Sequence, residues 1–295
     1  MKITFLGTSA MVPTKDRNHP SILFNYKEEN ILFDCGENIQ RQLTKLGFSS
    51  AKITKLLLTH WHGDHSLGIP GLIQSMSSHN FQGILEIYGP KNSKLHMKKI
   101  IDAFMLKNKI KISTKEISGK FFENKDFTLI AYPVKHSAPC LAYSFIEKPK
   151  RRINLEYLKK FDLQKHPLLG NLQKGKNIVY KGKKIKVKDA TYIVPGKKIT
   201  YITDTTLNNN CIKAAKDADI LICEATFASD LEKKAKEYLH LTAKQAAIIA
   251  KRAKAKKLIL THFSQRYKSL NHLLDEAKKV FKNTIIAEDF MSIEI

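Results

Sequence analysis

Three histidines and one aspartate fall within six consecutive positions of the stretch Thr59–His65, which reads THWHGDH. The stretch follows the apolar run Leu56–Leu58, which is typical of a buried strand. In an extended chain the first two histidines project to the same side, and the glycine lets the backbone turn toward a second position. Imidazole and carboxylate ligands without thiolate suit zinc with an open coordination position, so the fold must present a catalytic metal site at a strand end. A solvated polar loop is the weaker interpretation, because such a loop does not require three histidines.

The length and composition of the chain favour a globular protein. Its 295 residues, of which 43% are hydrophobic, can bury the core of one large domain, with or without an appendage. The apolar N-terminal stretch Met1–Gly7 is too short for a signal-peptide core or a membrane span, so we expect a soluble, cytoplasmic protein with no membrane partner. The cysteines at positions 35, 140, 211 and 223 form no Cys-x-x-Cys pair, which predicts reduced and mostly buried thiols.

An excess of positive charge is the second constraint. Lys and Arg number 51 against 27 Asp and Glu, and the net charge of +24 exceeds what solubility requires. Half of this excess lies between Lys148 and Lys188, which contain 14 basic residues and two acidic ones. Prolines and glycines interrupt the same segment, so we predict a basic arm at 147–188, inserted into a core made of 1–146 and 189–295. The arm is expected to bind a polyanion, and the alternative is a solvated basic loop.

The rest of the sequence alternates strands with helices, which predicts an α/β class (α+β). The clearest helix is expected over Ala243–Ala255, because Thr242 and Gln245 form a capping-box pattern at its start. The predicted strands are Lys2–Leu6, Ile22–Asn25, Ile31–Asp34, Lys55–Thr59, Leu85–Tyr88, Phe127–Val134, Leu141–Ile146, Ile199–Thr203, Ile220–Cys223 and Lys257–Thr261. The other predicted helices are Asn38–Leu46, Leu67–Ser77, Ser93–Met105, Asn209–Lys216 and Leu270–Phe281.

A near repeat in the sequence directs the search for further ligands. The stretch that ends at His60 reads LLLTH, and a later one that ends at His262 reads LILTH. His136 and Asp204 also follow predicted strands, and strand ends are where loops on a rigid scaffold carry function. Each of these residues alone is more often an ordinary hydrogen-bonded side chain. Together with the first cluster they make five histidines and two aspartates, which is enough for two metal ions with Asp204 as a bridging carboxylate.

The ordered series of these residues resembles the ligand series of the metallo-β-lactamase superfamily along nearly the whole chain. Within that superfamily the sequence is similar to the short form of the ribonuclease Z family. Four further stretches carry the likeness, matching that family's Pro-x-Lys-x-Arg-Asn, Glu-Ala-Thr, His-x-Thr and last-ligand motifs: Pro13–Asn18, Cys223–Phe227, His240–Thr242 and Thr261–Tyr267. Cys223 and Leu241 depart from the histidine and serine that are common in the family, and neither position belongs to the metal set.

The resemblance implies a four-layer αββα sandwich, a homodimer and two Zn²⁺ per subunit, with Mn²⁺ as an alternative ion. It implies one zinc held by His60, His62 and His136, the other held by Asp64, His65 and His262, and Asp204 as the bridge. It also implies that the basic segment is a protruding arm that grips precursor transfer RNA away from the chemistry. Counterion release would make that binding salt-sensitive but indifferent to base sequence.

The activity implied by the resemblance is that of an endoribonuclease that removes the 3′ trailer from precursor transfer RNA and leaves a 3′-hydroxyl at the discriminator nucleotide. Asp64 would act as general base, and His240, otherwise an ordinary histidine beside a capped helix, would protonate the leaving oxygen. Asp34 is interpreted as an outer partner of the metal ligands, and Glu224 either as structural or as the residue that orients His240. The predicted RNA contacts are Lys15, Arg17, Lys150, Arg151, Arg152, Lys174 and Lys176.

Two other classes of protein remain as alternatives. A small-molecule phosphodiesterase or sulfatase of the same fold would carry the same metal motif but would not require a basic arm. If the chain were a non-enzymatic RNA-binding protein with this fold, we would expect decayed metal ligands, whereas all seven are present. A large inserted nuclease domain is excluded, because only 68 positions separate His136 from Asp204.

Overall fold

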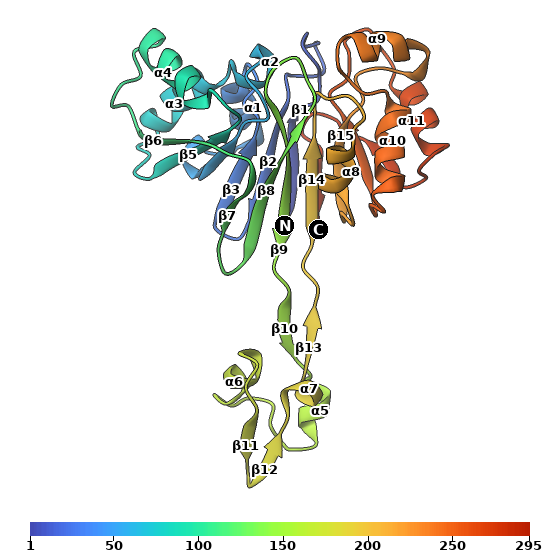
Figure 1. Ribbon diagram of the computed structural model, residues 1–295. Coiled ribbons are helices and arrows are strands. Elements are labelled where there is room, and N and C mark those ends of the chain that lie inside the picture. Colours follow the sequence, from blue (N-terminus) through green and yellow to red (C-terminus); the bar gives the residue numbers. More distant parts are fainter. The chain divides into compact units, whose positions relative to one another are not determined.

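The computed structural model describes residues 1–295 and divides into two compact units (Figure 1). Unit 1 comprises Met1–Phe122, Leu129–Phe145 and Lys198–Ile295, and unit 2 comprises Glu123–Thr128 and Ile146–Lys197. The predicted basic arm, 147–188, lies within unit 2. No helix of the chain is both long enough and apolar enough to cross a membrane. All four cysteines are buried and unpaired, as predicted.

Two large sheets, each of seven strands, dominate the fold. The first has the order β18 (Ser292–Glu294), β1 (Lys2–Gly7), β2 (Ser21–Tyr26), β3 (Glu29–Phe33), β4 (Lys55–Leu57), β5 (Ile84–Gly89) and β6 (Lys111–Glu116). The second has the order β17 (Thr284–Ile286), β16 (Leu258–Thr261), β15 (Ile220–Glu224), β14 (Lys198–Ile202), β9 (Cys140–Glu147), β8 (Phe127–Val134) and β7 (Gly119–Glu123). Strands β3 to β6 are parallel, and so are β14 to β17. The carboxyl ends of each parallel set therefore lie at one edge of its sheet.

Helices cover one face of each sheet, and aromatic side chains fill the space between the sheets. The helices against the first sheet are α1 (Ile39–Leu46), α3 (Ile69–Ser78) and α4 (Ser93–Ala103). Those against the second are α8 (Asn209–Ala215), α10 (Ala243–Arg252) and α11 (Asn271–Lys278). Between the sheets, the rings of Phe24 and Phe145 lie 4.7 Å apart and those of Phe33 and Tyr201 lie 5.8 Å apart. The result is the four-layer αββα sandwich that the resemblance implied.

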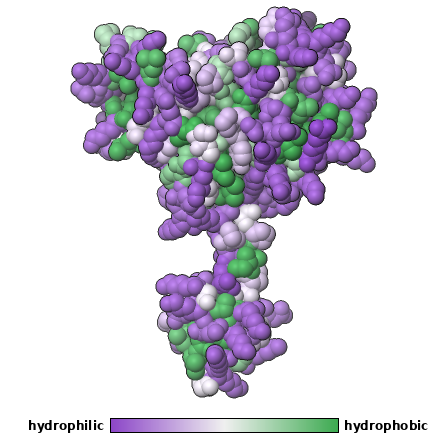
Figure 2. Space-filling view, viewed as in Figure 1, coloured by the Kyte–Doolittle hydropathy of each residue, from purple (hydrophilic) through white to green (hydrophobic).

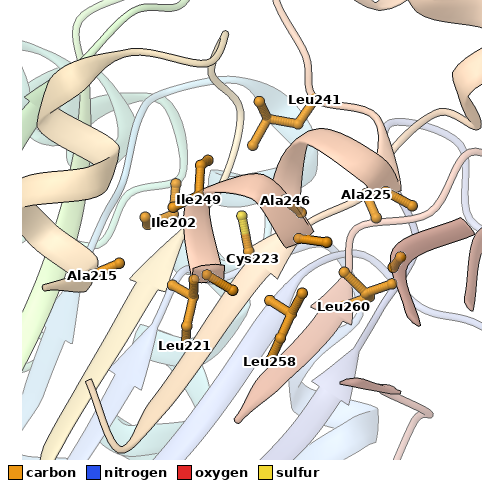
Figure 3. Close-up of a cluster of buried hydrophobic side chains, with 14 of the residues drawn as sticks. Ile202, Ala215, Leu221, Cys223, Ala225, Leu241, Ala246, Ile249, Leu258 and Leu260 are labelled. Carbon is orange, nitrogen blue, oxygen red and sulfur yellow. The ribbon is translucent and has the colours of Figure 1, made fainter. Parts of the chain in front are cut away.

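The packing of α10 follows directly from its sequence. Its buried face consists largely of alanines, which let the helix approach β15 and β16 closely, and Figure 3 shows Ala246 and Ile249 near Leu221 and Leu258. The predicted capping box is present, because Thr242 accepts from the Gln245 backbone N–H at 3.2 Å and the Gln245 side chain accepts from the Thr242 N–H at 3.0 Å. The helix ends earlier than predicted, before Lys254, whose φ of 55° is incompatible with a right-handed helix.

Unit 2 has secondary structure and a core of its own, which the irregular sequence of this segment did not predict. Its elements are β10 (Lys150–Ile153), α5 (Leu155–Lys159), α6 (Leu169–Gln173), β11 (Ile178–Tyr180), β12 (Lys183–Ile185), α7 (Val187–Ala190) and β13 (Thr191–Val194). β10 pairs with β13 and β11 pairs with β12, both antiparallel. The buried core consists of Leu158, Leu163, Leu172, Ile178, Ile185 and Ala190. Hydrophilic side chains cover much of its visible surface in Figure 2.

A buried and an exposed leucine of unit 1 provide a matched test of the hydrophobic core of that unit. Leu221 on β15 is fully buried, and Leu95 on α4 is 51% exposed. We expect Leu221→Ala to lower the free energy of unfolding by about 2–5 kcal/mol, because it removes buried methyl groups and leaves a cavity. Leu95→Ala should change it by less than about 0.5 kcal/mol. Urea unfolding of both variants measures the difference, and equal midpoints would contradict the assigned core.

Candidate metal centre

Both sheets contribute residues to one cluster, each from just beyond the end of a strand. In the first sheet, β4 is followed by His60 and His62 and then by the short helix α2 (Gly63–Ser66), which carries Asp64 and His65. In the second sheet, β8, β14 and β16 are followed by three further residues of the cluster: His136, Asp204 and His262. The LLLTH and LILTH stretches therefore meet from opposite sheets, and all seven predicted ligands come together.

Two members of the cluster and one buried neighbour adopt left-handed backbone conformations. Asp34, Asp204 and His262 have φ values of 56°, 36° and 60°, and each lies at the end of a strand. Such a conformation is uncommon for residues other than glycine, although aspartate and histidine tolerate it better than most. It costs of order 1–3 kcal/mol and persists only where the surrounding structure enforces it. Here it turns the chain sharply at the strand end, where the side chains face the cluster.

The seven residues form two groups that share Asp204. His60, His62 and His136 make one group with Asp204, and Asp64, His65 and His262 make the other. Within each group, one potential ligand atom per residue lies within 4.8 Å of those of the others. Asp204 Oδ2 lies 3.6 Å from His60 Nε2, and Oδ1 lies 3.1 Å from His262 Nε2. Each carboxylate oxygen therefore faces a different group.

The chemistry of the cluster fits a divalent metal ion. His60 is fully buried, and its Nε2 atom has no hydrogen-bond partner although it points toward the carboxylate of Asp204. A buried nitrogen without a partner is costly, and coordination of a cation satisfies it. The ligand set of imidazoles and carboxylates without thiolate is one that zinc and similar ions prefer.

Outer hydrogen bonds fix the orientation of two of the histidines. The buried carboxylate of Asp34 accepts from His65 Nδ1 at 2.8 Å, and the backbone carbonyl of Leu239 accepts from His136 Nδ1 at 3.2 Å. Each bond leaves the Nε2 atom of that ring available to a metal. Asp34 therefore lies outside the ligand set, in contact with one of its members.

Electrostatics in the cluster favour ionised carboxylates. Burial alone would raise the pKa of Asp204, but the surrounding histidines, first of all His262 and His65, hold it well below its usual value. Burial lowers the pKa of His60 well below its usual value, and His65 adds to the effect. Burial would also lower the pKa of His65, yet Asp64 and Asp204 raise it well above the usual value. A metal ion that binds His65 must therefore displace a proton.

His240 lies beside the metal groups and pairs with Glu224. Its Nδ1 atom is 3.1 Å from Glu224 Oε2 and 3.9 Å from Asp204 Oδ2. Glu224 is fully buried and also accepts from the backbone N–H of Thr205 at 2.7 Å. Burial would lower the pKa of His240, but the carboxylates of Glu224 and Asp204 outweigh it and raise the pKa to about 9. Of the two interpretations of Glu224, the contact with His240 favours the one in which it orients that histidine.

The cluster opens into a pocket whose other walls the sequence analysis did not identify. Lys234, Tyr238 and Arg266 line it, and the guanidinium of Arg266 lies 5.0 Å from the ring centre of Phe227. Met11 also lines the pocket and is 69% exposed. Arg266 occurs in the last-ligand motif, so the motif itself was the available signal. For Lys234, Tyr238 and Met11 only the tertiary structure shows that they line the pocket.

The predicted RNA-binding residues have varied surroundings. Lys15 is exposed, whereas Arg17 donates from Nη2 to the carbonyl of Tyr267 at 2.7 Å and so ties its loop to the segment after His262. In unit 2, Lys150 pairs with Glu147, and Arg151 donates to Thr191 Oγ1 at 2.8 Å. The remaining three are exposed: Arg152, Lys174 and Lys176.

The shared position of Asp204 leads to a prediction about metal binding. We expect Asp204→Asn to weaken Zn²⁺ binding at both groups by at least about 100-fold, because loss of an outer partner alone already costs 10–100-fold. Asp275→Asn on the exposed face of α11 is the matched control and should leave affinity unchanged. Competition with a chromogenic chelator measures both. Loss of only one of two bound ions would contradict a shared carboxylate.

Comparison with known proteins agrees with the fold. The family model described as Beta-lactamase superfamily domain matches residues 181–263, and that of Anti-Pycsar protein Apyc1 matches residues 1–124. The metallo-β-lactamase fold protein YhfI from Bacillus subtilis superimposes with a TM-score of 0.73, with 21% identity over 99% of this chain and 98% of that one, and shows the fold alone.

Two relatives are closer in sequence. The crystal structure of human tRNase Z, short form, superimposes with a TM-score of 0.74 and 28% identity, over 100% of this chain and 99% of that one. A ribonuclease Z from Methanothermobacter thermautotrophicus is 40% identical over 298 residues, which cover 100% of this chain and 97% of the relative. Likeness of this extent over the full length shows common descent, and the chain belongs to the ribonuclease Z family.

Proposed function

We propose that this protein removes the 3′ trailer from precursor transfer RNA and leaves a 3′-hydroxyl at the discriminator nucleotide. Membership of the ribonuclease Z family makes it an endoribonuclease that hydrolyses phosphodiester bonds. The observation that carries the proposal is the Asp204 carboxylate placed between two groups of histidines, with His240 beside it. The proposal includes a homodimer and a basic insert at 147–188 that binds the RNA.

The metal set of the proposal is two Zn²⁺ per subunit, with Mn²⁺ as the alternative ion. The first ion would be held by His60, His62 and His136, the second by Asp64, His65 and His262, and Asp204 would serve both. Two bound ions of this kind lower the pKa of water toward neutrality and neutralise charge on a phosphodiester.

Asp64 and His240 supply complementary proton-transfer groups. Burial would raise the pKa of Asp64, but its contacts with His65 and His262 lower it well below the usual value, so its carboxylate is ionised and can accept a proton. His240 is held by Glu224 at 3.1 Å and is protonated at neutral pH, since its pKa is raised to about 9. It can therefore protonate the leaving 3′ oxygen.

Positive charge supports an RNA substrate over a small molecule. Lys234 and Arg266 line the pocket at the metal groups. The basic segment of unit 2 carries half of the excess charge, and its Lys174 and Lys176 are exposed. Exposed lysines bind a phosphate backbone without regard to sequence. A small phosphodiester or sulfate ester would leave this charge without a role.

The first test is cleavage of a 5′-labelled precursor transfer RNA that carries a 3′ trailer, with Zn²⁺ or Mn²⁺ and at two salt concentrations. We expect one cut after the discriminator nucleotide, weakened by salt, and no cut by Asp64→Ala. Asp275→Ala, a change of an exposed aspartate on α11, is the matched control. Turnover of a small phosphodiester without any metal-dependent cleavage of RNA would instead support the small-molecule hydrolase.

Removing the charge of Glu224 tests the pairing with His240. We expect His240→Ala to lower the single-turnover rate by about 10²–10⁴-fold, the usual contribution of a general acid. Glu224→Gln should lower it by about 10–100-fold, as the loss of an outer partner does. Glu237→Gln on the exposed face of α9 (Glu232–Glu237) should leave the rate unchanged. A wild-type rate for Glu224→Gln would argue against an orienting role.

Neutralising two lysines of unit 2 tests its part in RNA binding. In the double variant Lys174→Ser and Lys176→Ser, we expect weaker binding of precursor transfer RNA. The slope of the logarithm of the binding constant against the logarithm of the salt concentration should become smaller by about 2, because each lysine is expected to neutralise one phosphate. Hydrolysis of a small phosphodiester should not change. The control is Lys98→Ser with Lys99→Ser, which removes the same charge from the exposed face of α4. Equal effects of the two double variants would show that only net charge matters.

A further inference from the structure

Two buried carboxylates outside the ligand set have the same pattern of contacts. Asp34 follows β3 in the first sheet, and Glu224 ends β15 in the second, and both are fully buried. Each accepts a hydrogen bond directly from a histidine Nδ1 atom, which belongs to His65 in the first case and to His240 in the second. Each is also bonded to the hydroxyl of a buried threonine. These threonines have no part in the chemistry described above.

In the first sheet the threonine is Thr59. Its Oγ1 atom donates to Asp34 Oδ1 at 2.9 Å and lies 3.1 Å from His60 Nδ1. A hydroxyl has one proton, and the ionised carboxylate is the stronger acceptor, so the proton of Thr59 is used by Asp34. The oxygen can then only accept from His60, which requires the proton of that ring to be on Nδ1. The lone pair is left on Nε2, the buried atom without a partner that faces Asp204.

In the second sheet the threonine is Thr226. Its Oγ1 atom donates to Glu224 Oε2 at 2.6 Å and lies 2.9 Å from His262 Nδ1. The backbone carbonyl of His262 is a second acceptor at 3.1 Å, but the shorter bond to the carboxylate takes the proton. His262 must therefore donate from Nδ1, and its Nε2 atom faces Asp204 Oδ1 at 3.1 Å.

We infer that Thr59 and Thr226 are positioning residues of the metal centre, each linking a buried carboxylate to one histidine ligand and holding that ligand as the Nδ1–H tautomer. One link serves each metal group, because His60 and His262 belong to different groups. Asp34 thereby supports His65 directly and His60 through Thr59. Glu224 supports His240 directly and His262 through Thr226, so the same carboxylate serves the proton donor and a metal ligand. The inference rests on the proposed role of these histidines as ligands.

A metal-binding series on the full chain tests the inference. The variants are Thr59→Val and Thr226→Val, which keep the shape of the side chain and remove the hydroxyl, and Thr59→Ser and Thr226→Ser, which keep the hydroxyl. The control is Thr200→Val, since Thr200 is equally buried and its hydroxyl bonds only to Ser144 and the Ala214 carbonyl. Competition with a chelator gives the affinity for each Zn²⁺ equivalent, and thermal unfolding of the metal-free variants reports their folding.

We expect each valine variant to bind one of its two Zn²⁺ equivalents about 10–100-fold more weakly, the usual effect of losing an outer partner, and each serine variant to bind as wild type. Thr200→Val should bind both ions normally. Wild-type affinities in the valine variants, or an equal loss in Thr200→Val, would overturn the inference. If the wild-type protein binds no Zn²⁺, it is the proposed metal centre that fails.

A second measurement needs no variant and so does not depend on the valine proteins folding. In the wild-type protein loaded with Zn²⁺ and labelled with ¹⁵N-histidine, NMR correlations through the imidazole ring identify which nitrogen carries the proton. We expect His60 and His262 to be protonated at Nδ1. A proton on Nε2 of either ring would refute the link through its threonine.

Discussion

The carboxylate of Asp204 stands between two groups of potential metal ligands, and the arrangement of the rest of the protein keeps it there. One of its oxygens faces His60 and the other faces His262, and these residues come from different sheets. A single negative charge at this point favours positive charge on both sides of it and lies where two cations would share it. The αββα sandwich is the means of bringing the ends of two sheets to the same carboxylate.

Parallel strands make this convergence simple. The residues after β4 in the first sheet, and after β14 and β16 in the second, all lie at carboxyl ends of parallel strands. Neighbouring parallel strands present their following loops at the same sheet edge, so ligands far apart in sequence require only a short loop each. Aromatic contacts such as that of Phe33 with Tyr201 pack the two sheets against each other and so keep their edges side by side.

Much of the fold and of the site could be predicted because the signals were local. The THWHGDH stretch, the near repeat of LLLTH and LILTH, and the capping box at Thr242 each occupy a few residues and need no partner to be recognised. The edge strands of both sheets, β18 and β6 in the first and β17 and β7 in the second, were not predicted, because short strands with mixed polarity are decided by pairing rather than by intrinsic preference. The core of unit 2 was also missed, because its apolar residues lie on short elements between prolines and glycines. For Glu224 the sequence left two interpretations open, and the contact with His240 favours one of them. Tyr238 could not be identified from the sequence, because only the tertiary structure brings it to the pocket.

The centre is assembled at a cost to stability, which argues that metal binding and folding are coupled. Without a metal, a buried nitrogen of His60 has no partner, and Asp34, Asp204 and His262 adopt left-handed conformations. An ion that binds only the folded chain stabilises it, so bound metal offsets the cost of these features. The hydrogen bonds from His65 to Asp34 and from His136 to the Leu239 carbonyl do not depend on an ion, since they fix two ligand rings through protein atoms alone. Histidine rings that are already fixed lose less conformational freedom when they bind a metal. The rigid backbone that holds the left-handed residues therefore also favours tight metal binding.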